Sequence, residues 1–170
     1  MINKEIYVNT TLDNLKNNLS NAIAVMSKSS NKLILVLRDK TDIRIEKDIK
    51  AFSDEYHIGR VNLGLQLSRY LIENDVPIND YLNMELKTGT PLIVDNAEIL
   101  FDSEIAINAF TLFKNIARHQ ILIVVLDGRI DSKEKFIYGT SSNKDFSQYE
   151  KLTDTYIIDL NGGVEWNTEI

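Results

Sequence analysis

Three short runs of consecutive apolar residues constrain the fold of this chain more than any other feature. They are "KLILVL" at 32–37, "PLIVD" at 91–95 and "ILIVVLD" at 121–127. Such runs are typical of strands covered on both faces, as in parallel sheets. Segments with helical spacing lie around them, at 12–26, 42–52, 65–73, 78–86 and 103–118. This alternation predicts an α/β fold of three layers, with a mostly parallel sheet flanked by helices.

Three further segments complete the predicted order of elements. "HIGRVNLG" at 57–64 indicates a short strand, and "KFIYG" and "TYIIDL" indicate strands on either side of a polar loop at 140–152. We find no internal repeat, linker or shift in composition along the 170 residues. A chain of this length suits one domain with a sizeable core, so we expect residues 1–170 to form a single domain.

Composition narrows the classes of function. No apolar run approaches the roughly 20 residues that span a bilayer, and the polar N-terminal stretch lacks the apolar segment of a signal peptide. We therefore expect a cytoplasmic protein with no membrane contact. The net charge of −6, without a dense run of Lys or Arg, argues against direct nucleic-acid binding. The absence of cysteine excludes disulfides and thiolate metal sites.

The first strand end worth examining follows the apolar run at 32–37, in "LVLRDKTDIR". Lys40 and Thr41 imitate the last two residues of the phosphate-binding pattern G-x-x-x-x-G-K-[ST]. The glycines of that pattern let backbone N–H groups wrap the phosphates, yet no glycine occurs before Gly59. Asp39 would also repel a phosphate. The pattern favours a plain strand-to-helix turn over a working nucleotide loop.

The second and third strand ends carry carboxylates. Asp95 ends an apolar strand in the manner of the acidic residue that orients Mg²⁺ in P-loop proteins. Asn96 stands where active ATPases of the AAA type carry a glutamate base, and Glu98 follows. The alternative is that Asp95 and Asn96 cap the next segment. Asp127 could join Asp95 and Glu98 in an acidic cluster, or simply begin an Asp-Gly turn.

Several segments together resemble the BrxF family, small P-loop proteins of type 3 BREX anti-phage systems. The resemblance runs in order from about Leu15 to Leu160 and rests on four segments: "RVNLGLQLSRYLIE", "PLIVDNAEILFD", "NIARHQILIVVLDGRI" and "KFIYG…DFSQY". It implies an AAA-like P-loop NTPase core. It also implies a role in bacterial defence beside a BrxC-type ATPase, a PglZ-type protein and a DNA methyltransferase.

The chain departs from this family where chemistry would begin, because "RDKTDIR" replaces the glycine-rich loop. We therefore expect no enzymatic activity, no catalytic residue and no cofactor, and a non-catalytic scaffold subunit of the defence complex. The alternative is a weak Mg-ATP-dependent switch or ATPase, completed by a partner or a neighbouring subunit in a homo-oligomer. It would use Lys40, Thr41, Asp95 and Glu98, with Asp95 holding the metal and Arg118 or Arg129 acting in trans.

Two other chemistries have less support in the sequence. A Mg²⁺ nuclease would need Asp95, Glu98, Asp102 and Asp127 to cluster, and no catalytic lysine stands at a recognisable spacing from them. His57 and His119 are far apart in the chain and lack cysteine partners, so we expect surface residues rather than metal ligands.

Overall fold

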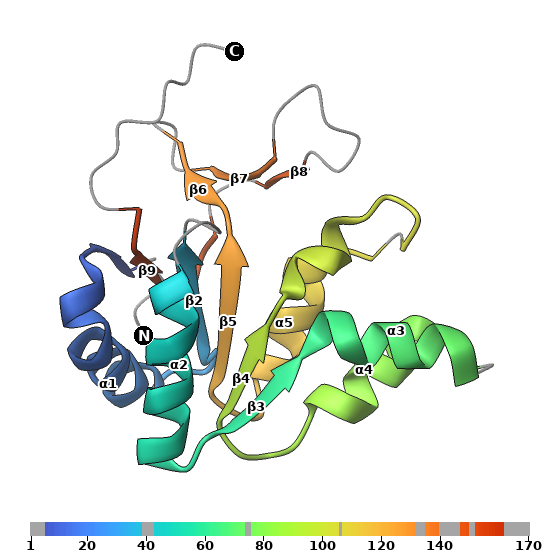
Figure 1. Ribbon diagram of the computed structural model, residues 1–170, viewed down its shortest axis with the longest axis horizontal. Helices are drawn as coiled ribbons and strands as arrows, with labels where there is room; N and C mark the ends of the chain where they lie inside the picture. Colours follow the sequence, from blue (N-terminus) through green and yellow to red (C-terminus); the bar gives the residue numbers. More distant parts are fainter. Residues whose placement is uncertain are drawn as a thin grey trace.

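The computed structural model in Figure 1 describes residues 6–38, 43–73, 76–105, 107–131, 135–139, 147–149 and 152–161. Six parallel strands form one sheet in the order β1-β9-β2-β5-β4-β3. Their bounds are β1 Ile6–Asn9, β2 Leu33–Arg38, β3 Gly59–Asn62, β4 Leu92–Asp95, β5 Leu122–Asp127 and β9 Thr155–Asp159. The chain is thus an α/β protein whose parallel sheet is flanked by helices.

The apolar strands divide their side chains between the two faces of the sheet. In β2, Leu33, Leu35 and Leu37 enter one core cluster, whereas Ile34 and Val36 enter the other. The same alternation holds in β4 and β5, because successive side chains of a strand point to opposite faces. Both faces are buried, which explains why these strands show no polar alternation in the sequence.

Helices cover each face, as Figure 1 shows. One face packs against α1 (Leu15–Met26) and α2 (Ile43–Tyr56), through residues such as Leu19 and Ile49. The other packs against α3 (Leu63–Glu73), α4 (Ile78–Leu86) and α5 (Ala109–Ala117). Short 3₁₀ turns, η1 (Leu12–Asn14) and η2 (Ala97–Phe101), precede α1 and follow β4. These positions confirm the expected three layers.

A second, antiparallel sheet lies beyond the carboxyl end of β5 (Figure 1). It consists of β6 (Arg129–Ile130), β7 (Phe136–Tyr138) and β8 (Ser147–Tyr149). Phe136 and Tyr149 pack with Phe101 and Phe110, which joins this sheet to η2 and α5. The expected strand at 135–139 is therefore present, but it pairs outside the main sheet. The expected loop at 140–152 contains β8.

The prediction of a helix at 103–118 is wrong in its first part, because α5 begins only at Ala109. Two local hydrogen bonds explain the late start: the Asp102 carboxylate accepts one from the Glu104 N–H at 2.9 Å, which stabilises a turn. The Asn108 side chain then accepts one from the Thr111 N–H at 3.1 Å and caps α5. These side chains satisfy the backbone in a turn and a cap, so the helix begins only at Ala109.

The described helices include none that is both long and apolar enough to span a membrane.

Candidate functional site

Polar side chains gather where the parallel strands end. The carboxyl ends of such strands meet at one edge of the sheet, which is where α/β proteins bind ligands. Here β2 ends in Arg38, β4 in Asp95, β5 in Asp127 and β9 in Asp159. We call this set of residues and their polar contacts the carboxyl edge. Its chemistry depends on what each charged group touches.

Asp95 is buried and paired with an arginine from the neighbouring strand. The Arg60 Nε–H of β3 donates to Asp95 Oδ2, and the Asp95 side chain is only 7% exposed. A second guanidinium nitrogen of Arg60, Nη2, lies 3.6 Å from Glu46 Oε1 on α2. Arg60 therefore links β4 to α2 and neutralises the carboxylate that the sequence offers as a Mg²⁺ ligand.

Asp127 is paired in the same way. Arg38 and Asp127 are register partners on β2 and β5, and the Arg38 Nε–H donates to Asp127 Oδ1 at 3.2 Å. Their side chains are 11% and 14% exposed. The Asp-Gly turn expected here is not formed, because β5 leads through Gly128 directly to β6 and Gly128 has no positive φ. Gly128 is needed for another reason: a Cβ there would lie 2.5 Å from the ring of Phe136.

Glu98 reaches Asp127 from η2. Its Oε1 accepts a hydrogen bond from the Asp127 backbone N–H at 2.7 Å. Burial, followed by the Asp127 carboxylate, raises the pKa of Glu98, while Arg38 and the backbone hydrogen bonds act in the opposite direction. The carboxylate is thus engaged with the backbone of β5.

Asn96 stands where an ATPase would carry its glutamate base, and its role here is conformational. It adopts φ 53° and ψ 39°, a left-handed conformation in which Asn is enriched. It occupies the cap position of η2 without a side-chain capping bond, and the Asp95 carboxylate is paired with Arg60, so the expected capping by these two side chains does not occur. Gly64 of α3 lies beside Asn96: a Cβ at residue 64 would make an ordinary van der Waals contact, 3.7 Å from the Asn96 Cβ.

The last part of the carboxyl edge involves β9 and β1. The Tyr7 hydroxyl donates to Asp159, whose other oxygen accepts from the backbone N–H and the side-chain amide of Asn161. The same amide donates to the Gly128 carbonyl at 3.1 Å. The buried Asn161 Oδ1 has no hydrogen-bond partner among the described residues. These bonds hold the chain beyond β9 against the end of β5.

The two other predicted site residues that the structure describes, Arg118 and Arg129, do not join this edge. Lys40 and Thr41 lie outside the described residues. Arg118 is the exposed residue after α5 and precedes β5, so it lies at the opposite edge of the sheet. Arg129 belongs to β6, and its Nη1–H donates to the Gly139 carbonyl at 3.1 Å. Within one chain, Asp95 and Glu98 have separate partners, Arg60 and the Asp127 backbone N–H, and neither arginine that the alternative invoked is among them.

Across the described part of the chain, no group of three or more His, Asp or Glu side chains is arranged to hold a metal ion. The cluster of Asp95, Glu98, Asp102 and Asp127 that a Mg²⁺ nuclease would need is not formed, because each of these carboxylates has a different protein partner. His57 and His119 are exposed residues in turns before β3 and β5.

Arg60 is the residue that sequence reasoning missed. Nothing in "GRVN" indicates its partner, since the contact depends on strands β3 and β4 being neighbours and on their register, Arg60 beside Ile93 and Asn62 beside Asp95. Arg38 was noticed only as a replacement for a glycine. Its position at the end of a strand that pairs with β5 was the available signal.

Comparison of the chain with family models, with curated proteins and with solved structures found no match in any of the three.

Proposed function

We propose that this protein is a degenerate P-loop domain that does not hydrolyse nucleotide and acts as a non-catalytic interaction subunit of a bacterial anti-phage complex of the type 3 BREX kind. The observation that carries the first part is the buried ion pair between Asp95 and Arg60. The resemblance to the BrxF family carries the second part. The ion pair gives the carboxyl edge a structural role in place of nucleotide binding.

The order of strands supports P-loop ancestry. The strand before the degenerate loop, β2, is followed by helix α2, and β5 lies between β2 and the acidic strand β4. An AAA-type ATPase needs the loop strand, the phosphate-sensing strand and the acidic strand side by side at one edge. Here their ends are Arg38, Asp127 and Asp95, in that order across the sheet.

The same edge does not fit Mg-ATP. A Mg²⁺ ion needs oxygen ligands, and the Asp95 Oδ2 oxygen already accepts from the guanidinium group of Arg60. Separating a buried pair leaves an uncompensated charge and costs about 3–5 kcal/mol. Asn96 cannot act as a base, and "RDKTDIR" contains no glycine to wrap a phosphate.

Calorimetry tests the loss of nucleotide binding. The full chain is titrated with ATP and with ADP in the presence of Mg²⁺, alone and with its co-purified partners. We expect no saturable heat. Micromolar binding that disappears in Lys40→Ala or Asp95→Ala would overturn the proposal and establish the nucleotide-dependent switch instead.

Affinity purification from the native host tests the assignment to defence. The tagged full chain should recover a BrxC-type ATPase, a PglZ-type protein or a DNA methyltransferase, and an untagged strain should recover none. Failure to recover any of the three from the tagged strain would contradict the assignment, whatever the calorimetry shows.

A further inference from the structure

Three segments meet at the end of the sheet opposite the carboxyl edge (Figure 1). They are 27–32, 87–91 and 114–121, and they lead into the adjacent strands β2, β4 and β5, whose first residues are in register. Hydrogen bonds join the segments. The Lys32 N–H donates to the Ala117 carbonyl at 2.9 Å. The Thr88 N–H donates to Gln120 Oε1 at 2.9 Å.

These segments are rich in cations and contain no acid. They hold five of the chain's 19 Lys and Arg residues and none of its 25 Asp and Glu residues. We call the five the basic patch: Lys28, Lys32, Lys87, Lys114 and Arg118. Within the described part of the chain, none of them forms an ion pair with a carboxylate. The sequence shows no dense run of Lys or Arg, but the fold brings these cations together from distant segments.

Helix ends account for part of this charge. Lys87 and Arg118 are the C-cap residues of α4 and α5, and Lys28 follows the C-cap of α1. Cations are favourable there because each helix C-terminus carries roughly half a negative charge. Three such ends, with Glu85 before the second segment and Asp154 before β9, supply fewer negative charges than the five cations. The basic patch therefore remains positive.

The acids of the carboxyl edge do not cancel the basic patch. The strand between the two ends, β5, has six residues and is roughly 20 Å long at 3.3 Å per residue. The Debye length is about 10 Å at 0.1 M salt, so charges at the two ends are largely screened from one another. The net charge of −6 describes the whole chain and not this surface.

We infer that the basic patch binds the phosphate backbone of a double-stranded nucleic acid without reading its sequence. Lys and Arg contact phosphates together with hydroxyl groups, and Ser30, Thr88 and Thr90 are exposed beside the cations. An acidic protein partner would favour exposed aromatic or apolar anchors. The three segments contain no Phe, Tyr or Trp, and their aliphatic residues Ile116 and Ile121 are buried.

The lack of aromatic residues in these segments also favours a duplex over a single strand, because single strands are bound by stacking their bases on aromatic side chains. The inference goes beyond the proposed function and does not depend on it.

Fluorescence anisotropy tests the inference with the full chain and two short labelled duplexes of one sequence, one of DNA and one of RNA. We expect saturable binding that weakens steeply as salt rises from about 50 to 200 mM, since each phosphate contact contributes about −0.9 to the slope of log K against log salt. A DNA duplex of unrelated sequence should bind with the same affinity. Binding of only one of the two duplex types would identify the nucleic acid that the basic patch takes.

A charge reversal locates the binding. Lys87→Glu with Arg118→Glu removes two phosphate contacts and adds repulsion, so the affinity should fall at least about tenfold. Lys47→Glu with Lys50→Glu, at exposed positions of α2, changes the net charge equally and is the matched control. It should keep the affinity within about twofold. Circular dichroism checks that both variants are folded.

A milder variant serves if the charge reversal impairs folding. Lys28→Gln removes one exposed charge and should reduce the salt slope by about 0.9. Lys50→Gln should leave the slope unchanged.

Four results would overturn the inference. They are no saturable binding of either duplex, binding that is insensitive to salt, an equal loss of affinity in the Lys47 and Lys50 control, and tighter binding of a single strand than of the duplex. A polyglutamate peptide that competes as well as unlabelled duplex would assign the basic patch to an acidic protein, which also overturns it. None of these results involves ATP, so failure here is distinguishable from failure of the proposed function.

Discussion

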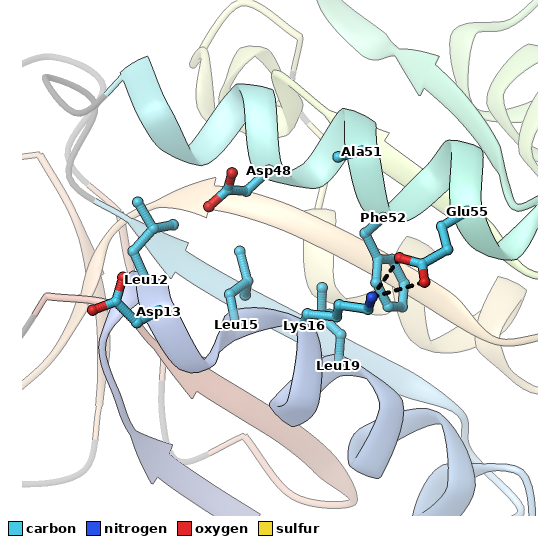
Figure 2. Close-up of a pocket in the computed structure, with 9 residues that line it drawn as sticks. All are labelled: Leu12, Asp13, Leu15, Lys16, Leu19, Asp48, Ala51, Phe52 and Glu55. Atoms are coloured by element: carbon cyan, nitrogen blue, oxygen red, sulfur yellow. Dashed lines mark hydrogen bonds and ion pairs between the residues drawn. The ribbon is translucent and has the colours of Figure 1, made fainter.

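The carboxyl edge and the α1–α2 groove both carry several acidic side chains, but these are paired with arginine at the edge and mostly unpaired in the groove. The groove is the hollow between helices α1 and α2 that Figure 2 shows. At the carboxyl edge, Asp95 pairs with Arg60 and Asp127 with Arg38. In the groove, Asp13 and Asp48 have no such partner among the described residues, and only Glu55 is paired. The edge is where an α/β fold is expected to bind a ligand, but the groove is where charge is left available.

This difference separates structural acids from acids free to bind. A buried carboxylate requires a partner because the loss of water around a charge costs several kcal/mol. An exposed carboxylate keeps its water and can exchange it for a cationic partner. The position of an acid at a strand end therefore says less about metal binding than the identity of the group that faces it.

The largest expected effect comes from removing the arginine at the carboxyl edge. Arg60→Ala leaves Asp95 buried and unpaired, so the free energy of unfolding should fall by about 3 kcal/mol in urea denaturation. Arg69→Ala, at an exposed position of α3, should change it by less than about 0.5 kcal/mol.

A double variant sharpens this result. Arg60→Met with Asp95→Leu replaces the pair by apolar side chains and should recover most of the lost stability, since no charge then remains buried. If Arg60→Ala cost as little as Arg69→Ala, the ion pair would not be structural, and Asp95 would be available for another ligand.

The next effect concerns how tightly the small antiparallel sheet packs against the carboxyl edge. Gly128→Ala places a methyl group against the buried ring of Phe136 and should lower the free energy of unfolding by about 1–3 kcal/mol. At Gly59 an added Cβ meets only Leu92 at 3.4 Å, so Gly59→Ala should cost less than about 1 kcal/mol. Equal costs in the two variants would show that the small sheet does not pack against this edge.

Glu98 predicts a dependence on pH. Its pKa in the folded chain is raised above the ordinary value of 4.5. In the pH range between 4.5 and the raised pKa, the folded chain therefore holds a proton that the unfolded chain has lost. The stability should therefore fall as the pH rises from 4.5 through the raised pKa, and then level off. Glu98→Gln lacks this titration and keeps an oxygen to accept from Asp127 N–H.

The variant's stability relative to the unaltered chain should accordingly increase with pH across that window. Urea denaturation at a series of pH values measures it, with Glu104→Gln at an exposed position as the control. A difference that stays constant with pH would contradict the buried environment assigned to Glu98.

The smallest effect is expected in the groove. Asp13→Asn with Asp48→Asn removes no described contact and should change the free energy of unfolding by less than about 0.5 kcal/mol. Thermal unfolding measures this directly. A loss as large as that of Arg60→Ala would place these carboxylates among the structural acids and remove the contrast between the two regions.

Much of the fold could be predicted because its signals are local. The buried strands at 33–38, 92–95 and 122–127 and the helix at 78–86 follow from apolar runs and from helical spacing. The start of α5 was missed because Asp102 and Asn108 offer the backbone local hydrogen bonds that compete with a longer helix. The edge strand β1 was missed because its apolar run is only three residues long and lies in an N-terminal stretch that is otherwise polar.

The candidate site was less predictable because its contacts are not local. The carboxylates at 95 and 127 were found from their place at strand ends. Their partners are 35 and 89 residues away along the chain and depend on the order and register of the strands. The groove between α1 and α2 likewise requires knowing which two helices share a face of the sheet.

The central claim is that arginine, and not a metal-bound nucleotide, neutralises the carboxyl edge. The most direct test follows the ¹H–¹⁵N signals of the Arg38 and Arg60 Nε–H groups while the full chain is titrated with Mg-ATP. We predict protected signals at both positions that do not move with ligand. A saturable shift of the Arg60 signal, absent in Asp95→Asn, would contradict the account.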